Sequence, residues 1–156
     1  MQLYLLRHAE AEDDPKNDEQ RALTAKGEKQ ARNVGKFCRS HSIIPAIILS
    51  SPLRRAEETA RIFARELDVP NVVQLEEFLR PGMTAKSTLS GLEKYSEKAS
   101  VLLVGHEPDF SRLAGSLIGT HAENIHFRKA ALMSVNLPKM ESGAGAIDFL
   151  IPVKCL

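Results

Sequence analysis

Cysteine is scarce in this sequence: the two cysteines, Cys38 and Cys155, lie far apart and form no CxxC pair. This spacing excludes a zinc ribbon, a CxxC redox motif and a disulfide scaffold, so we interpret both side chains as reduced structural thiols. Two nucleotide-binding patterns are also missing. The sequence contains neither GxxxxGKS/T nor GxGxxG, which leaves no case for a bound ATP or dinucleotide.

Long apolar runs are missing as well, because none approaches the ~18 residues of a membrane span. The chain also starts without the basic and apolar regions of a secretory leader. We therefore expect a cytoplasmic protein that does not enter membranes. An excess of one charge is absent too: 21 basic residues face 20 acidic ones, giving a net charge of +1. This balance argues against nucleic-acid or membrane binding through bulk charge, so any selectivity for anions must be local.

The composition is that of a folded globular protein, with 43% hydrophobic and 26% charged residues in a chain of 156. That length fits a single domain over residues 1–156. Apolar runs of strand length alternate with amphipathic helical segments up to residue 119. This alternation predicts an α/β fold, a three-layer α/β/α sandwich whose mostly parallel sheet has a mixed edge. The predicted strands are an apolar run ending at residue 7 and residues 46–49, 72–75, 101–104, 132–137 and 146–151.

Capping residues and breakers define the predicted helices. Thr24 is a suitable N-cap for a helix that runs to about Ser40. Ser51 is the expected N-cap of a second helix, with Pro52 in its first position. Two more helices are predicted, over residues 87–96 and from residue 108 to a stop at Gly119.

Polar residues follow three of the predicted strands. Arg7 and His8 end the first strand, Arg54 and Arg55 come just after the second, and His106 follows the fourth. Because the carboxyl ends of parallel strands meet at one edge of a sheet, we expect these side chains to form one site. Guanidinium groups and helix N-termini bind phosphate, and a neutral imidazole can be a nucleophile near pH 7. The pattern favours a phosphate-handling site.

Three motifs carry a resemblance to a known family. The segment 6–9, Leu-Arg-His-Ala, resembles the Arg-His-Gly signature of the histidine phosphatase superfamily, the phosphoglycerate mutase-like enzymes. Residues 51–60 resemble its second arginine motif and residues 104–107 its second-histidine motif. The pattern Asp18-x-x-Arg21-x-Leu23-Thr24-x-x-Gly27 is most similar to the SixA-type phosphohistidine phosphatases. The resemblance implies a phosphoglycerate mutase-like sheet.

The resemblance also implies roles for individual residues. His8 would be the nucleophile that takes the phosphoryl group, while Arg7, Arg55 and His106 would bind its oxygens. Arg21 matches a position beside the phosphate pocket. Arg54 does not match the motif and is expected to be a partly exposed neighbour, and Ala9 replaces the signature glycine in a turn that we expect to survive.

The proton donor is less defined by the motifs. Glu77 lies near the position at which many superfamily members carry a catalytic glutamate, and the alternative is a solvated loop charge. The SixA-type enzymes that this chain resembles have no firmly assigned proton donor. Phosphohistidine has a good nitrogen leaving group, which reduces the need for such a donor. Ser111 and Asn136 are further candidates for lining the pocket, although neither belongs to a motif.

No metal or cofactor is predicted. Residues 9–18 are acidic and interrupted by Pro15, which predicts a surface loop. The carboxylates of Glu10, Glu12, Asp13 and Asp14 are interpreted as solvated, because a nucleophilic histidine must keep one nitrogen free of metal. The remaining histidines lack a motif context, and surface or capping roles are expected for His41, His121 and His126.

The sequence thus predicts a cofactor-independent phosphatase that removes phosphate from histidine on a protein through phospho-His8. The partner would be a phosphorylated protein such as a histidine phosphotransfer domain, with phosphate ion in the site. The short chain leaves little for a lid, which suits a protruding protein side chain. Two alternatives remain: a phosphomonoesterase of small metabolites such as sugar phosphates, using the same site, and a non-catalytic phosphate-recognition module.

Overall fold

The sheet of this protein places the carboxyl ends of its first four strands at one edge. The computed structural model describes residues 1–14 and 16–156, so Pro15 of the predicted loop lies outside the described residues. Within this part of the chain, six strands form one sheet in the order β3-β2-β4-β1-β5-β6. Strands β1 to β4 are mutually parallel, whereas β5 is antiparallel to β1 and β6, which confirms the predicted mostly parallel sheet with a mixed edge. The strands are Gln2–Arg7 (β1), Ile47–Ser50 (β2), Val73–Leu75 (β3), Ser100–Gly105 (β4), Leu132–Asn136 (β5) and Ala146–Ile151 (β6).

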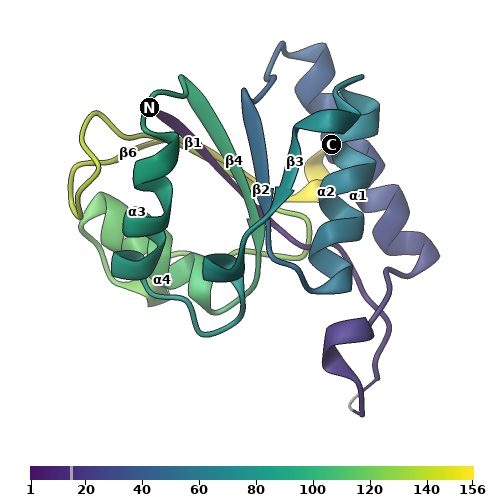
Figure 1. Ribbon diagram of the computed structural model, residues 1–156. Coiled ribbons are helices and arrows are strands. Elements are labelled where there is room, and N and C mark those ends of the chain that lie inside the picture. The colour runs from purple at the N-terminus through teal and green to yellow at the C-terminus, as the bar shows by residue number, and fades with distance from the viewer. Residues whose placement is uncertain (15) are drawn as a thin grey trace.

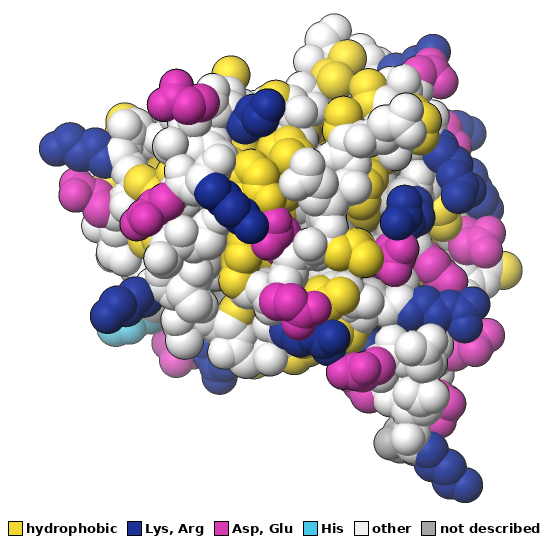
Figure 2. Space-filling model, in the orientation of Figure 1, with side chains coloured by type: hydrophobic (Ala, Val, Ile, Leu, Met, Phe, Trp, Pro, Cys, Tyr) yellow, Lys and Arg dark blue, Asp and Glu magenta, His cyan; other side chains and the backbone are white. Residues whose placement is uncertain are grey.

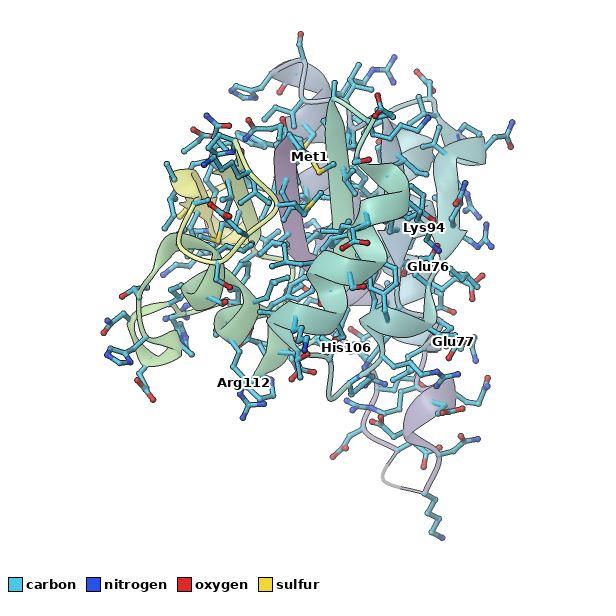
Figure 3. The ribbon with its side chains drawn as sticks, turned by 60° about the vertical axis from the view of Figure 1, so that its left-hand side comes forward. Met1, Glu76, Glu77, Lys94, His106 and Arg112 are labelled. Carbon is cyan, nitrogen blue, oxygen red and sulfur yellow. The ribbon has the colours of Figure 1, made fainter. Side chains whose placement is uncertain are left out.

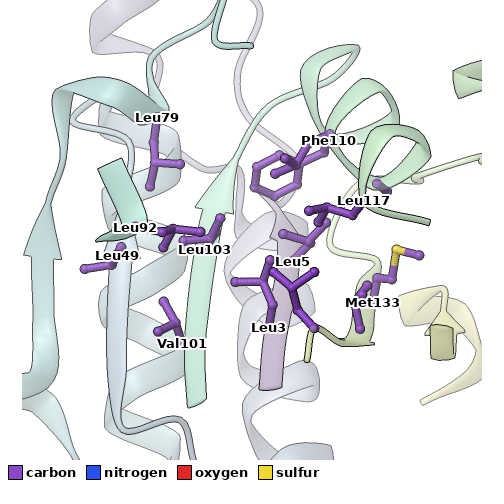
Figure 4. Packing of buried hydrophobic residues seen from close by; sticks show 14 of the residues in the cluster. Leu3, Leu5, Leu49, Leu79, Leu92, Val101, Leu103, Phe110, Leu117 and Met133 are labelled. Atoms are coloured by element: carbon purple, nitrogen blue, oxygen red, sulfur yellow. The ribbon is translucent and has the colours of Figure 1, made fainter. Parts of the chain in front are cut away.

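Helices cover both faces of the sheet, so the predicted three-layer sandwich is confirmed (Figure 1). Alternation along the strands produces the two cores. In β1, Leu3 and Leu5 pack into the cluster beside α4 (Figure 4), whereas Leu6 packs into the cluster beside α1 and α2. The helices are Ala25–Ser40 (α1), Arg54–Glu66 (α2), Ala85–Leu92 (α3) and Asp109–Ile118 (α4).

The start of α1 is as predicted and the start of α2 is not. The hydroxyl oxygen of Thr24 accepts the main-chain N–H of Gly27 at 3.0 Å, the expected N-cap bond. The prediction that Ser51 caps the second helix is wrong, because α2 begins at Arg54 with Leu53 at the N-cap. The Ser51 hydroxyl lies 2.8 Å from Nε2 of His106. The Ser51 hydroxyl, which the local sequence predicted as a helix cap, is therefore hydrogen-bonded with the buried imidazole of His106, which follows β4.

The third helix is shifted relative to its prediction. Thr84 and Ser87 form a reciprocal capping box, so α3 starts at Ala85, and a 3-10 turn over Glu93–Tyr95 replaces its expected end. Gly119 ends α4 with a φ of 73°, as predicted. None of the helices in the described chain has both the length and the apolar character needed to cross a membrane.

The segment between β1 and α1 leaves the body of the molecule as a projection (Figure 1). It includes the 3-10 turn Asp18–Gln20 (η1), and acidic side chains gather on it (Figure 2). An isolated bridge between Ala11 and Leu23 joins its two arms. The projection therefore begins and ends beside the carboxyl end of β1, where the sequence placed the site.

Candidate active site

Arg7, His8 and His106 lie together because β1 and β4 are neighbouring strands. Arg7 pairs with Gly105, and the main-chain N–H of His8 donates to the carbonyl of Gly105 at 2.9 Å. The rings of His8 and His106 have centroids 5.2 Å apart, and the two residues are 8% and 3% exposed. Figure 3 shows His106 at one end of the sheet and Met1 at the other. The parallel register thus brings two predicted site histidines to one edge.

The ring of His8 is held in one tautomer. Its Nδ1 lies 2.8 Å from the carbonyl oxygen of Ala9, and a carbonyl only accepts, so Nδ1 carries the proton and Nε2 keeps its lone pair. Burial, reinforced by the positive charges of Arg55 and Arg7, lowers the pKa of His8 to about 4 against the opposing bond to Ala9. His8 is therefore neutral at pH 7, as a nucleophile must be.

His106 is also neutral, and one of its nitrogens is free. Burial, followed by the charges of His8 and Arg55, lowers its pKa to about 3. Nε2 is hydrogen-bonded with the hydroxyl of Ser51, whose oxygen also accepts the N–H of Leu53 at 3.3 Å. Within the described residues, Nδ1 is buried and has no hydrogen-bond partner. When Ser51 donates to Nε2, Nδ1 carries a proton that an anion can accept.

Arg7, which is half-buried, and Arg55, which is buried, surround the histidines with further unpaired donors. Arg7 donates through Nη1 to the carbonyl of Phe127 at 2.8 Å, and Arg55, whose side chain is 6% exposed, donates through Nη1 to the carbonyl of Asp18 at 2.7 Å. Among the described residues, Nε of each arginine is buried without a partner. A buried unpaired donor costs about 1–3 kcal/mol, and a bound oxyanion would satisfy such donors.

Asp18 links the second arginine motif to Arg21. One carboxylate oxygen of Asp18 accepts Nη2 of Arg55 at 3.1 Å, and the other accepts Nη1 of Arg21 at 3.0 Å. The bond to Arg21, together with the charge of Arg55, lowers the pKa of Asp18. The charge of Arg21 also contributes to the low pKa of His8. The projection therefore brings Arg21 to the site, and Asp18 orients both guanidinium groups.

Among the described residues, the Glu77 carboxylate bonds Arg80 and not the arginines or histidines of this cluster. Its side chain is 77% exposed and accepts Nε of Arg80 at 2.5 Å, and Arg80 also pairs with Glu19 at 2.8 Å. Figure 3 shows Glu77, His106 and Arg112 at the same end of the sheet. In this structure the Glu77 carboxylate is therefore a solvated ion-pair partner, and a role as proton donor would require it to leave Arg80.

The pocket-lining candidates differ in position. Asn136 pairs with Gln2, at the amino end of β1, so it lies at the opposite edge of the sheet from the site. Ser111 donates its hydroxyl to the carboxylate of Glu107 at 2.7 Å, and Glu107 is close enough to oppose the lowering of the pKa of Arg7 by burial. Arg54 is exposed and pairs with Glu58, as expected of a neighbour outside the site.

Sequence reasoning missed the local roles of three residues: Ser51, Asp18 and Glu107. Each lies within a motif, and that position was the available signal. The contacts of Ser51 with His106 and of Asp18 with Arg55 come from distant parts of the chain, whereas Glu107 bonds Ser111 four residues away. Among the described residues, no group of three or more His, Cys, Asp or Glu side chains is arranged to hold a metal ion. The donors that the structure does assemble are cationic or N–H groups suited to an anion.

Residues 3–81 match the family model of the histidine phosphatase superfamily (branch 1). This range includes Arg7, His8, Arg21, Arg55 and Glu77, and it ends before His106. The chain is 33% identical over 128 residues to the phosphohistidine phosphatase SixA homolog of Haemophilus influenzae, covering 76% of this chain and 78% of that protein.

Solved structures share the whole fold. The protein histidine phosphatase SixA in complex with tungstate superposes with a TM-score of 0.89 at 26% identity, covering 99% of both chains. The alpha-ribazole phosphatase of Shigella flexneri superposes with a TM-score of 0.77 at 18% identity, covering 98% of this chain and 97% of that one. The second likeness concerns the fold alone.

Proposed function

Because the chain belongs to the histidine phosphatase superfamily and is of the SixA type, we propose that it removes the phosphoryl group from phosphohistidine on a protein, with His8 as nucleophile. Enzymes of this superfamily are hydrolases of phosphoester or phosphoramidate bonds, and this chain is a histidine-type phosphatase. One observation carries the proposal: His8 is buried and neutral, its Nδ1–H donates a hydrogen bond to the Ala9 carbonyl, and the lone pair on its Nε2 is free.

The reaction proceeds in two displacements at phosphorus. In the first, Nε2 of His8 attacks, the P–N bond of the substrate breaks, and the leaving imidazole nitrogen keeps the electron pair and takes a proton from water. In the second, water attacks phospho-His8, its P–N bond breaks, Nε2 recovers its lone pair and inorganic phosphate leaves. Arg7, Arg55 and Nδ1 of His106 donate to the phosphoryl oxygens as negative charge moves between them.

Two points favour phosphohistidine over a phosphoester. The relative from Haemophilus influenzae is named as a phosphohistidine phosphatase homolog, and the solved SixA structure holds tungstate, an oxyanion that resembles phosphate. The Glu77 carboxylate is also engaged by Arg80. An imidazole leaves more readily than an alkoxide, which needs a proton donor, so a site without a poised carboxylic acid is better matched to the P–N bond.

The test compares substrate classes without added metal. Purified protein is incubated with a histidine phosphotransfer domain phosphorylated on its histidine and, separately, with p-nitrophenyl phosphate and a panel of sugar phosphates. We expect fast loss of phosphohistidine and slow turnover of the esters. The variant His8→Ala should lose about three orders of magnitude or more in rate. His41→Ala is the matched control, because that histidine is exposed and bonded to Ser40 and Phe37.

Three outcomes contradict the proposal in different ways. Faster turnover of the esters would assign the site to small metabolites. Phosphohistidine turnover that survives in His8→Ala would remove His8 as the nucleophile. Binding of phosphate without turnover of any substrate would leave a phosphate-recognition module. A rapid alkaline quench should trap a phosphoenzyme in the wild type and none in His8→Ala, and acid should release its phosphate, as expected of a P–N bond.

A further inference from the structure

A groove lined by cationic side chains opens beside Arg7. It has a volume of about 400 Å³, its lining includes Arg7, Lys26, His126, Arg128, Lys129 and Lys154, and no carboxylate belongs to that lining. We call these six residues the basic groove. Four separate parts of the chain build it: the end of β1, the first turn of α1, the segment before β5 and the C-terminal 3-10 turn Val153–Cys155. It is thus a product of the tertiary fold that the sequence does not display as a run of charge.

Most of the charge in the basic groove has no partner within the protein. Lys26 pairs with Glu10 at 2.9 Å. Arg128, Lys129 and Lys154 are exposed. Over residues 1–14 and 16–156, they form neither an ion pair nor a side-chain hydrogen bond. The bond from Lys26 and, to a smaller extent, the charge of Lys129 lower the pKa of Glu10. Arg128 and Lys154 have no carboxylate contact in the described part of the chain and remain available to an external anion.

The basic groove is continuous with the candidate active site through Arg7. The buried Nε of Arg7 belongs to the unpaired donors around His8, while Arg7 also lines the groove. Its Nη1 donates to the carbonyl of Phe127, the residue directly before Arg128. A phosphorylated side chain that reaches His8 would therefore hold the surface around it against the groove.

We propose that the basic groove docks a carboxylate-rich surface of the phosphorylated protein beside its phosphohistidine, an inference that rests on the proposed function. The form of the groove favours a protein surface over a second anionic group of a small metabolite. A site for one small anion needs converging, buried donors, whereas Lys129 and Lys154 are exposed and come from different segments. Spread, mobile cations suit several carboxylates and act on encounter and orientation.

The test reverses two charges of the basic groove that lie outside the catalytic cluster. Lys129→Glu/Lys154→Glu is compared with Lys98→Glu/Lys139→Glu, which makes the same change in net charge. The control lysines are exposed and lie near the amino ends of β4 and β1, at the opposite edge of the sheet. The substrates are an acidic histidine phosphotransfer domain carrying phosphohistidine, the same domain with its surrounding carboxylates changed to amides, phosphoramidate, and a small bisphosphate.

We expect the groove variant to lose about tenfold or more in kcat/KM for the acidic phosphoprotein at low salt, mainly through KM. Its turnover of phosphoramidate should stay within about twofold of wild type, and added salt or the amide-substituted domain should reduce the difference. The control variant should behave as the wild type does with every substrate.

Several results would overturn the proposal. An unchanged rate on the acidic phosphoprotein, an equal loss in the control variant, or an equal loss on phosphoramidate would each remove docking by the groove. A loss confined to the bisphosphate would assign the groove to a small metabolite. Absence of phosphohistidine turnover by the wild type would overturn the proposed function and the docking proposal with it, whereas wild-type turnover that the groove variant leaves unchanged would overturn docking alone.

Discussion

Burial of two neutral imidazoles should make the stability of this protein fall steeply in mild acid. The ordinary pKa of 6.5 is lowered to about 4 for His8 and about 3 for His106. Below pH 6.5 each imidazole is protonated in the unfolded chain but stays neutral in the folded chain. Its contribution to the free energy of unfolding is therefore complete above pH 6.5 and is lost as the pH falls toward the folded pKa. Between about pH 7.5 and 5, linkage gives a loss of about 2 kcal/mol for each histidine, or about 4 kcal/mol together.

The assay is urea denaturation at several pH values in that window, in buffers free of phosphate. The window lies above the ordinary pKa values of Asp18 and Glu10, whose pKa values are lowered in the fold, so their stabilising contributions are still complete there. The double variant His8→Gln/His106→Gln removes both imidazoles and keeps polar side chains. We expect the free energy of unfolding of the wild type to fall by about 4 kcal/mol, and that of the variant to change by much less.

Two results would refute this reasoning. A wild type whose free energy of unfolding is the same at both pH values would mean that His8 and His106 accept protons in the fold. An equal fall in the double variant would assign the acid sensitivity to other groups. Added inorganic phosphate offers a further check, because an anion beside the imidazoles favours their protonated forms and should flatten the wild-type profile.

Three other substitutions test separate parts of the site. Arg55→Lys should lower kcat/KM for phosphohistidine about 100-fold, because lysine lacks the planar fork, while urea denaturation reports whether the fold is retained. Ser51→Ala removes the partner of Nε2 on His106 and should lower kcat about tenfold with little change in KM, which steady-state kinetics would show. Gly27→Ala would place a Cβ 1.9 Å from the carbonyl oxygen of Glu10, so the free energy of unfolding should fall by more than about 2 kcal/mol; an unchanged urea midpoint would contradict that clash.

Features of the fold that depend on local chemistry were predictable from the sequence. The Thr24 hydroxyl oxygen caps α1 by accepting the main-chain N–H of Gly27, three residues away, and Gly119 ends α4 in a left-handed conformation that favours glycine. The strands were also predictable, because short apolar runs bounded by breakers have few alternatives. Once those strands are parallel, Arg7, His8 and His106 must meet at one edge of the sheet.

Features that depend on distant partners were not predictable. Serine is favoured at helix N-caps, but the hydroxyl of Ser51 is hydrogen-bonded with His106, 55 positions away. Glu77 lies near the position at which many superfamily members carry a catalytic glutamate, yet it pairs with Arg80, which also pairs with Glu19 of the projection. Local propensity carries no information about such contacts, and the same is true of the basic groove, whose cations come from four segments of the chain.

The SixA-type pattern from Asp18 to Gly27 helps to hold together the two ends of the projection between β1 and α1. Because Gly27 has no Cβ, the carbonyl of Glu10 lies against the first turn of α1, where it also accepts the N–H of Thr24 at 3.0 Å. This contact joins the two ends of the projection, so the middle of the projection loses less freedom when Asp18 binds Arg55. This SixA-type pattern thus contributes to the phosphate site indirectly, through the backbone that positions Asp18 beside Arg55. Damage at Gly27 should therefore reach Arg55, although Gly27 itself supplies no donor to the phosphate.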